Sequence, residues 1–268
     1  MPQANARSSP LEVSAGIPQR VASVARALPV PRRRRNIAPH QEAHVADLKL
    51  FSTLGVVSVL DELLPRLGLE VDAVYEPTKR LVDRIQAGER ADLAILTSDA
   101  IDELTAAGVL ASGSRVDLAR SHVGMAVAPG AARPDISTVE AFRQTLLAAG
   151  TIGYSRAGAS GIFFAGLLER MGLAAEVNAK ATVIPSGFTG QLLLDGKVEL
   201  AVQQVSELMA VPGIDILGRI PKELQPDTIF SAGLFAETGK EREARDFVAA
   251  IAGPSVALLY VEKGLEPV

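Results

Sequence analysis

The sequence predicts an α/β fold in which mostly parallel β-sheets carry helices on both faces. Short apolar segments with strand character alternate with segments of helical periodicity from Asp47 to the end of the chain. This alternation is typical of βαβ units, whose crossover helices cover a parallel sheet. The 268 residues suffice for one large α/β domain or for two smaller lobes.

The first half of this pattern contains three predicted strands, each followed by a helix. Pro65 is expected to limit or bend the end of the first helix, and Gly88 to end the second. Ser98 or Asp99 is expected to cap the third helix, which ends before Gly108. The predicted strands cover residues 48–52, 71–75 and 93–96.

The second half continues the same alternation. Apolar residues alternate over 123–127 and predict a strand that leaves the first lobe, and 229–235 is the expected return crossing. Ser137 and Glu140 have the spacing of a capping box, which predicts a helix start at Ser137. Two helices close the chain, and the remaining predicted strands cover residues 151–154, 182–184, 200–203 and 214–217.

The composition excludes several classes of protein. The chain has no Cys, which excludes disulfides, thiolate catalysis and Cys-ligated metals. Aromatic residues make up 4% and Trp is absent, so platforms for stacking nucleic-acid bases are scarce. The net charge is -4, and seven Arg against two Glu in residues 1–46 leave -9 for the remainder. Such an acidic body does not suggest a nucleic-acid partner.

The sequence predicts no metal site and no cofactor, and it does not assign a catalytic role to any residue. His40 and His44 lie in the N-terminal segment, and His122 has no HExxH motif or carboxylate cluster near it. His122 is therefore interpreted as a strand histidine with satisfied hydrogen bonds. A Walker loop, a dinucleotide fingerprint and a nucleophile elbow are absent from the sequence.

Residues 1–46 are expected to form a disordered or artefactual N-terminal tail. They are rich in Pro, Ala, Ser and Arg, and they have no sustained hydrophobic period. The run Arg32–Arg35 is not followed by the apolar core of a signal peptide. One hypothesis places the natural start near Val45. Because no signal peptide is visible, the sequence by itself predicts a cytoplasmic protein, and we expect a monomer. We expect no direct membrane insertion, since no apolar run approaches about 18 residues.

Four loops that lead from a predicted strand into a predicted helix predict a site for a small anion. In parallel α/β folds, ligands bind beyond the carboxyl ends of the strands, where helices begin. Free N–H groups and the partial positive charge of a helix N-terminus attract anions there. The candidate ligand-binding residues are Ser52, Thr53, Thr78, Lys79, Ser155, Arg156, Ser160, Gln204 and Ser206.

The first two loops each have a second interpretation. Ser52 and Thr53 precede Gly55 and either donate their hydroxyls to an anion or cap a helix. Thr78 and Lys79 open a helix, where a lysine is locally unfavourable. A bound anion would relieve that cost, and the alternative is a lysine that extends into solvent.

The third and fourth loops are richer in polar groups. The segment 154–161 is small, hydroxylated and glycine-containing, and Arg156 can place two hydrogen bonds on one carboxylate. Gln203 and Gln204 are adjacent amides at a strand end, and the alternation of a strand points one of them inward. Gln204 and Ser206 are the preferred ligand contacts, and an edge-strand polar pair is the alternative.

From residue 47 onward the chain resembles the molybdate-binding-protein-like branch of the type II periplasmic binding proteins. The resemblance covers nearly all of that part, and the end of the chain, GLEP at 264–267, fits it too. Four stretches carry it: LKLFSTLG at 48–55, IQAGERADLAILTSDAIDELTAAGVL at 85–110, TIGYSRAGASGIFFAGLLERMGL at 151–173 and GKVELAVQQVSELMAVPGIDILG at 196–218.

The resemblance implies two lobes joined by two crossing strands, with the ligand cleft between them. Lobe 1 would combine residues 47–126 with 234–268, and lobe 2 would cover 127–233. Thr53 and Thr78 fall where that family has oxyanion-binding residues, and the 155–161 loop matches a segment of backbone donors. The resemblance also implies a periplasmic location and an ABC permease as partner.

Two departures from the family pattern bear on the ligand. Gln204 stands where the family has an aromatic hydroxyl. Lys79 and Arg156 are charged where such molybdate pockets use neutral donors, which favours a carboxylate ligand. The branch is also similar to aconitate isomerase, an enzyme that moves a double bond by abstracting and returning a proton. The alternative function is therefore an isomerase of a polycarboxylate, with Glu207 or His122 as base if either faces the cleft.

Overall fold

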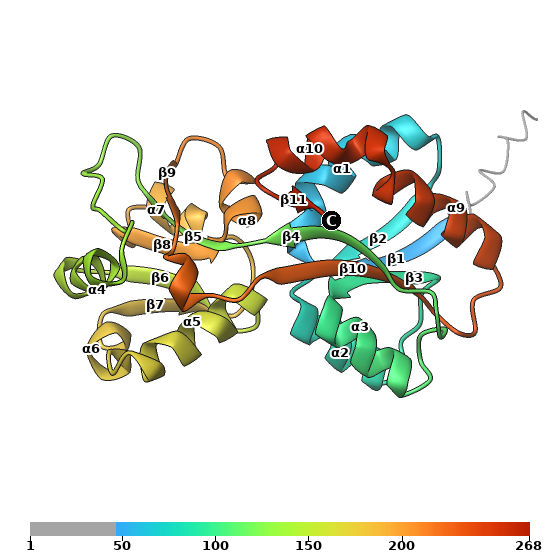
Figure 1. The fold of residues 1–268 in the computed structure, drawn as a ribbon, viewed down its shortest axis with the longest axis horizontal. Helices are drawn as coiled ribbons and strands as arrows, with labels where there is room; N and C mark the ends of the chain where they lie inside the picture. Colours follow the sequence, from blue (N-terminus) through green and yellow to red (C-terminus); the bar gives the residue numbers. More distant parts are fainter. Residues whose placement is uncertain (1–46) are drawn as a thin grey trace, which may run out of the picture. The chain divides into compact units, whose positions relative to one another are not determined.

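The computed structural model describes residues 47–268, which form two β-sheets flanked by helices (Figure 1). This arrangement confirms the α/β class that the sequence predicts. The expected tail, its arginine run and the proposed start near Val45 lie outside the described residues.

The first sheet has six strands in the order β11-β4-β10-β3-β1-β2. β1 is parallel to β2 and β3, whereas β10 is antiparallel to β3 and β4. Ser52, the last residue of β1, pairs with Tyr75 and Ile95, so the carboxyl ends of the three parallel strands meet at one edge. The strands are β1 (Leu48–Ser52), β2 (Val71–Tyr75), β3 (Leu93–Thr97), β4 (Val116–Ser121), β10 (Thr228–Leu234) and β11 (Glu266–Pro267).

The second sheet has five strands in the order β7-β6-β8-β5-β9. β6 is parallel to both β7 and β8, and β5 is antiparallel to β8 and β9. The carboxyl ends of β6, β7 and β8 therefore also share one edge. The strands are β5 (Val123–Val127), β6 (Ile152–Ser155), β7 (Ala181–Ile184), β8 (Leu200–Gln204) and β9 (Asp215–Arg219).

The chain crosses between the two sheets twice. It leaves the first sheet after Ser121 and enters the second at Val123, so His122 is the crossing residue. It returns over residues 220–227, between β9 and β10. The strand predicted at 123–127 therefore belongs to the second sheet. The return strand predicted at 229–235 corresponds to β10 and belongs to the first sheet. The division into lobes at residues 126 and 234 stays a prediction.

Helices cover both faces of the first sheet (Figure 1). Leu48 and Leu50 of β1 pack into a core with α1, α9 and α10, whereas Phe51 packs into a second core with α2 and α3. The helical elements of residues 47–268 are η1 (Leu54–Val56), α1 (Val57–Leu67), α2 (Thr78–Gln86), α3 (Ser98–Ala106), α4 (Val139–Ala148), α5 (Ala159–Arg170), α6 (Ala174–Asn178), α7 (Gly190–Leu194), α8 (Val205–Met209), η2 (Lys222–Leu224), α9 (Glu241–Ala252), η3 (Pro254–Val256) and α10 (Ala257–Glu262).

Two predicted helix caps are wrong by one residue. The N-cap of α3 is Thr97, not Ser98 or Asp99. The N-cap of α4 is Thr138, whose hydroxyl accepts a hydrogen bond from the backbone of Ala141 at 3.1 Å. The expected capping box at Ser137 therefore does not form. A cap depends on which residue turns from extended to helical backbone, and residue types one position apart satisfy that pattern equally well.

Within the described residues, no single helix is long and apolar enough to cross a membrane. The bent pair Glu241–Ala252 and Pro254–Glu262 passes the same test by length and composition.

Candidate functional site

A cavity of about 540 Å³ lies between elements of the two sheets. The first sheet contributes the beginnings of α2 and α3, and the second contributes the beginning of α5. The return crossing at residues 226–229 lines the same cavity. These segments are far apart in sequence, and each strand-to-helix junction among them lies at the carboxyl edge of a sheet. Of the nine candidate residues, Thr78 and Lys79 line this cavity.

Thr78 and Lys79 open α2 directly after Pro77, whose backbone is fixed in an extended conformation. The Thr78 side chain is buried, and its Oγ1 has no hydrogen-bond partner among residues 47–268. The Lys79 Nζ lies 3.0 and 3.1 Å from the two carboxylate oxygens of Asp83, one helical turn further along. The lysine charge is therefore compensated within α2, and its side chain is largely exposed.

Ser155 ends β6, Arg156 lies in the loop that follows, and Ser160 is the second residue of α5. Both serines are 1% exposed, and neither Oγ has a hydrogen-bond partner in the described part of the chain. The Arg156 backbone N–H donates to the carbonyl of Ile184 at 2.8 Å, but its side chain is exposed and does not line the cavity. A Cβ at Gly161 would lie 1.7 Å from the Ser155 carbonyl oxygen, so only glycine permits this close approach of α5.

Ser52 and Thr53 are both buried at the end of β1. The Ser52 hydroxyl donates to the carbonyl of Thr53 at 3.1 Å, and the Thr53 N–H donates to the carbonyl of Ile95 at 2.8 Å. Thr53 is the N-cap of η1 but makes no side-chain hydrogen bond to that turn. Neither residue lines the 540 Å³ cavity.

The adjacent amides Gln203 and Gln204 have different partners. Gln204 Oε1 accepts from the hydroxyl of Ser121 at 2.9 Å, and its Nε2 lies 3.5 Å from the hydroxyl of Thr228, which lines the cavity. The next hydroxyl, on Ser206, is buried and has no hydrogen-bond partner in the described structure. Gln204 therefore links β8 of the second sheet to β4 and β10 of the first.

A fifth strand-to-helix loop, residues 185–189, was missed by the sequence reasoning. Gln203 holds this loop: its Oε1 accepts from the N–H and the hydroxyl of Thr189 at 2.6 and 2.9 Å, and its Nε2 donates to Gly187. The loop joins β7 to α7 at the same edge as the loops after β6 and β8. The sequence Ser186–Gly190 is small and hydroxylated, and that signal was available.

Glu207 is a buried carboxylic acid in the first turn of α8. Its side chain is 5% exposed, and its Oε2 has no hydrogen-bond partner among the described residues. Burial raises the pKa of the Glu207 carboxyl to about 7, although hydrogen bonds from the Gln203 side chain and the Gln204 backbone act in the opposite direction. α8 packs against η1 of the first sheet, which follows Thr53. Glu207 thus lies close to the junction of the two sheets.

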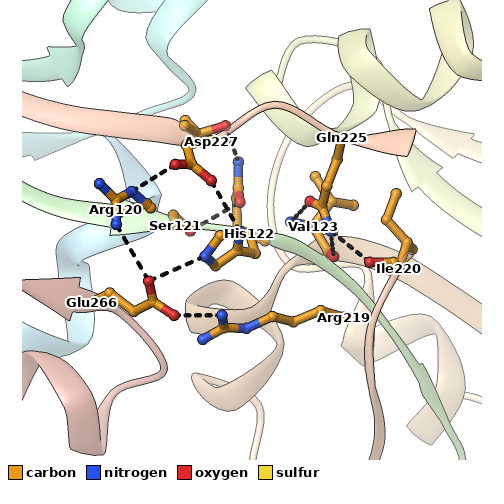
Figure 2. A network of polar contacts seen from close by, with 11 residues as sticks. Arg120, Ser121, His122, Val123, Arg219, Ile220, Gln225, Asp227 and Glu266 are labelled. Atoms are coloured by element: carbon orange, nitrogen blue, oxygen red, sulfur yellow. Dashed lines mark hydrogen bonds and ion pairs between the residues drawn. The ribbon is translucent and has the colours of Figure 1, made fainter. Parts of the chain in front are cut away.

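His122 lies in a polar network at the crossing between the sheets (Figure 2), and one member of this network, Asp227, also lines the 540 Å³ cavity. Its Nδ1 is 3.8 Å from Asp227 and its Nε2 is 3.5 Å from Glu266. Arg120 pairs with Asp227 at 2.8 Å, and Arg219 pairs with Glu266 at 2.5 Å. These groups line a second cavity of about 400 Å³, and His122 does not line the first one. In residues 47–268, no group of His, Asp or Glu is arranged to hold a metal ion.

Four buried hydroxyls, those of Thr78, Ser155, Ser160 and Ser206, have no hydrogen-bond partner in the described structure. They lie at a strand end or in the first turns of helices of both sheets, and of the four only Thr78 lines the 540 Å³ cavity. An unsatisfied buried polar group costs about 1–3 kcal/mol. Oxygen atoms of a bound anion would satisfy such donors. The two sheets, the two crossings and this cavity together define a two-lobed binding protein of the type II periplasmic fold.

The chain belongs to the family described as bacterial extracellular solute-binding proteins, whose sequence pattern matches residues 58–266. It is 36% identical over 234 residues to a protein from Pseudomonas sp. named aconitate isomerase, and the match covers 84% of this chain and 89% of the relative.

Solved structures show the same fold at lower sequence identity. The periplasmic molybdate-binding protein of Azotobacter vinelandii matches with a TM-score of 0.69 and 16% identity, covering 81% of this chain and 98% of that chain. The sulfate-binding protein of Mycobacterium tuberculosis matches with a TM-score of 0.61 and 15% identity, covering 82% and 86%. These likenesses confirm the predicted fold class and the resemblance to periplasmic binding proteins.

Proposed function

We propose that this protein binds a small organic anion with several carboxylates in the cavity between its two sheets. The observation that carries the proposal is the set of four buried hydroxyls without protein partners, on loops that begin helices of both sheets. Hydroxyl groups and helix N-termini supply donors and partial positive charge, which suit an anion better than a cation.

The choice of a carboxylate over a tetrahedral oxyanion rests on the relative named aconitate isomerase, at 36% identity. The molybdate- and sulfate-binding proteins are 16% and 15% identical, so they support the fold and not the ligand. Lys79 and Arg156 supply weaker support, because Lys79 is paired with Asp83 and the Arg156 side chain is exposed. In this proposal the nine candidate residues contribute to binding, directly or by shaping the loops.

The family description, a bacterial extracellular solute-binding protein, supports a proposed role as the substrate-binding protein of an ABC-type transporter. Donors lie on both sheets, and the described part of the chain crosses between the sheets only near His122 and over residues 220–227. An anion that contacts both sheets would favour the arrangement in which they approach each other, which is a hinge motion. A permease that reads this arrangement would be the partner.

The second candidate function is isomerisation of an unsaturated tricarboxylate such as aconitate. Two observations favour it: the 36% identical relative and the buried carboxyl of Glu207. A carboxylate base would remove a proton from the methylene carbon, and the electron pair would spread over three carbons. Return of the proton to the far carbon would shift the double bond, with no other reactant consumed.

A thermal-shift screen tests the proposed binding. Molybdate, tungstate, sulfate, citrate and cis- and trans-aconitate would be compared at equal ionic strength. A ligand at 100 times its Kd stabilises the folded state by about 2.7 kcal/mol, which raises the Tm by several degrees. We expect a carboxylate to give the largest rise, and a rise with molybdate or tungstate alone would contradict the choice of ligand. Proton NMR of aconitate incubated with the protein would then detect turnover.

A further inference from the structure

The second sheet gathers four buried polar atoms that have no partner in the described part of the chain. They are the hydroxyls of Ser155, Ser160 and Ser206 and the Oε2 of Glu207. Ser155 ends β6 and Ser160 lies in the first turn of α5, whereas Ser206 and Glu207 lie in the first turn of α8, directly after β8. β6 and β8 are adjacent parallel strands, so their following loops lie side by side at the carboxyl edge. One member of this group is an acid, and none of the four residues lines the 540 Å³ cavity itself.

The position of Glu207 fixes one side of its carboxyl and leaves the other unpaired. Gln204 is the N-cap of α8, and Glu207 is the third residue of the helix. A glutamate at this position reaches back to the backbone N–H of the N-cap residue, and the carboxyl has such a hydrogen bond from Gln204. The Gln203 side chain is a further partner. Oε2 keeps its hydrogen-bonding capacity for another group.

Among residues 47–268, no cation forms an ion pair with this carboxyl. α8 packs against β5, β8, β9 and η1, and of these elements only β9 contains titratable residues. On β9, Arg219 pairs with Glu266, and Asp215 lies 3.9 Å from Arg133. Gly264 approaches α8 from the C-terminal segment, where the neighbouring Lys263 pairs with Glu62. The free energy of burying Glu207 is therefore not offset by a neighbouring positive charge.

We propose that Glu207 carries a proton in the anion complex and donates a hydrogen bond from Oε2 to the bound anion, so that the site takes up one proton with its ligand. This inference rests on the proposed anion binding and does not require turnover; with its proton on, Glu207 is a proton donor and not the base of the second candidate function. Two carboxylates in contact inside a low-dielectric site cannot both stay ionised, and one proton between them removes the repulsion. Glu207 then also selects for anions that accept a hydrogen bond at this position.

The expected coupling follows from the titration of the unliganded protein. Because the pKa of Glu207 is raised to about 7 by burial, its carboxyl is mostly protonated at pH 5.5 and mostly ionised at pH 8. Binding at pH 8 should therefore take up close to one proton from solution, and binding at pH 5.5 should take up close to none. Above pH 7 the Kd should rise by about tenfold per pH unit, the dependence expected for one linked proton.

Isothermal titration calorimetry of the full chain with tricarballylate tests the proposal. This saturated tricarboxylate cannot undergo a double-bond shift, and its carboxyl groups are ionised above pH 7. Titrations at pH 8 in buffers with different ionisation enthalpies give the number of protons taken up. We expect about one for the wild type and none for Glu207→Gln, whose affinity should also lose its pH dependence. Glu237→Gln changes an exposed carboxyl and should behave like the wild type.

The outcomes separate this inference from the proposed function. If tricarballylate and trans-aconitate both fail to bind the wild type, the carboxylate ligand itself is wrong. Tight binding to the wild type without proton uptake at pH 8 overturns the role of Glu207 and leaves the proposed binding intact. Because this result comes from the wild type, it stands even if the Gln variant does not fold. Equal proton uptake by the wild type and a folded Glu207→Gln variant would also overturn the proposed role of Glu207.

Discussion

The hydroxyl of Ser121 donates a hydrogen bond to Oε1 of Gln204 at 2.9 Å, joining the last residue of β4 to the last residue of β8. Both side chains are almost completely buried. Ser121 also precedes His122, where the chain crosses to the second sheet, and Figure 2 shows it beside the charged network of that crossing. One amide therefore ties the two sheets together where the chain passes between them.

Gln204→Ala should destabilise the fold through this contact. The substitution leaves the buried Ser121 hydroxyl without its partner, at a cost of about 1–3 kcal/mol. Urea unfolding would measure the loss. In a double-mutant cycle, Ser121→Ala should lower the additional cost of Gln204→Ala, because the two residues share one interaction. Strictly additive effects would show that the bond contributes nothing to stability.

Gly161→Ala should disrupt the loop between β6 and α5, since a Cβ there would lie 1.7 Å from the Ser155 carbonyl oxygen. The backbone shift needed to admit this methyl group costs about 1–3 kcal/mol, and the displaced loop should also weaken anion binding. Gly166→Ala is the matched control on the same helix, because its Cβ would meet only the end of Arg170 at 3.6 Å.

The control variant Gly166→Ala should gain stability by up to about 1 kcal/mol, because alanine favours a helix interior more than glycine does. Thermal unfolding of both variants, with and without the ligand found by the screen, provides the comparison. Equal stability of the two variants would show that the close approach of α5 to Ser155 is not required.

The strands around the site could be predicted because their apolar runs are unambiguous. Residues 48–52 and 71–75 were predicted with the bounds that the structure shows. β4 was missed, since its sequence VDLARS mixes charged and apolar residues. β4 pairs with β10 along most of its length and with β11 at Ala119 and Arg120, and both partner strands come from much later in the chain. That tertiary pairing leaves no periodic signal in the local sequence.

The polar partners in the site were harder to predict than its loops. β8 is buried along its whole length, so alternation alone could not say which of Gln203 and Gln204 contacts which neighbour. The Lys79–Asp83 pair has i,i+4 spacing and could have been recognised from the sequence. The burial of Glu207 could not, because it depends on packing between α8 and elements remote in sequence.

Ser160→Ala should separate stability from binding. The Ser160 hydroxyl is buried without a partner in the described structure, so its removal should leave the free energy of unfolding unchanged or slightly higher. If the hydroxyl contacts the anion, affinity should fall by about tenfold, the equivalent of one neutral hydrogen bond.

Ser231→Ala is the control for this prediction, because the buried Ser231 hydroxyl donates to Asp117 at 2.6 Å in the first sheet. That variant should lose about 1–3 kcal/mol of stability and keep its affinity for the ligand. Urea unfolding and calorimetric titration of the two variants give both quantities. A stable Ser160→Ala protein with unchanged affinity would remove Ser160 from the site.

Glu207→Gln should change how stability depends on pH in the absence of ligand. Burial raises the pKa of Glu207 from 4.5 to about 7 in the folded protein. Between these values the folded state holds more protons than the unfolded state, so the contribution of this group is fully present below about pH 4.5 and is lost as pH rises to about 7. The loss for such a shift is on the order of 3 kcal/mol.

Glutamine cannot ionise, so the variant should lack this loss. The free energy of unfolding of Glu207→Gln relative to the wild type should therefore rise between pH 5 and pH 7 and stay level above pH 7.5. Urea unfolding across this range measures the difference, and Glu237→Gln, an exposed site, should show none. A constant difference between the Gln variant and the wild type would mean that the Glu207 carboxyl titrates near its ordinary value, and that the packing of α8 does not hold it neutral.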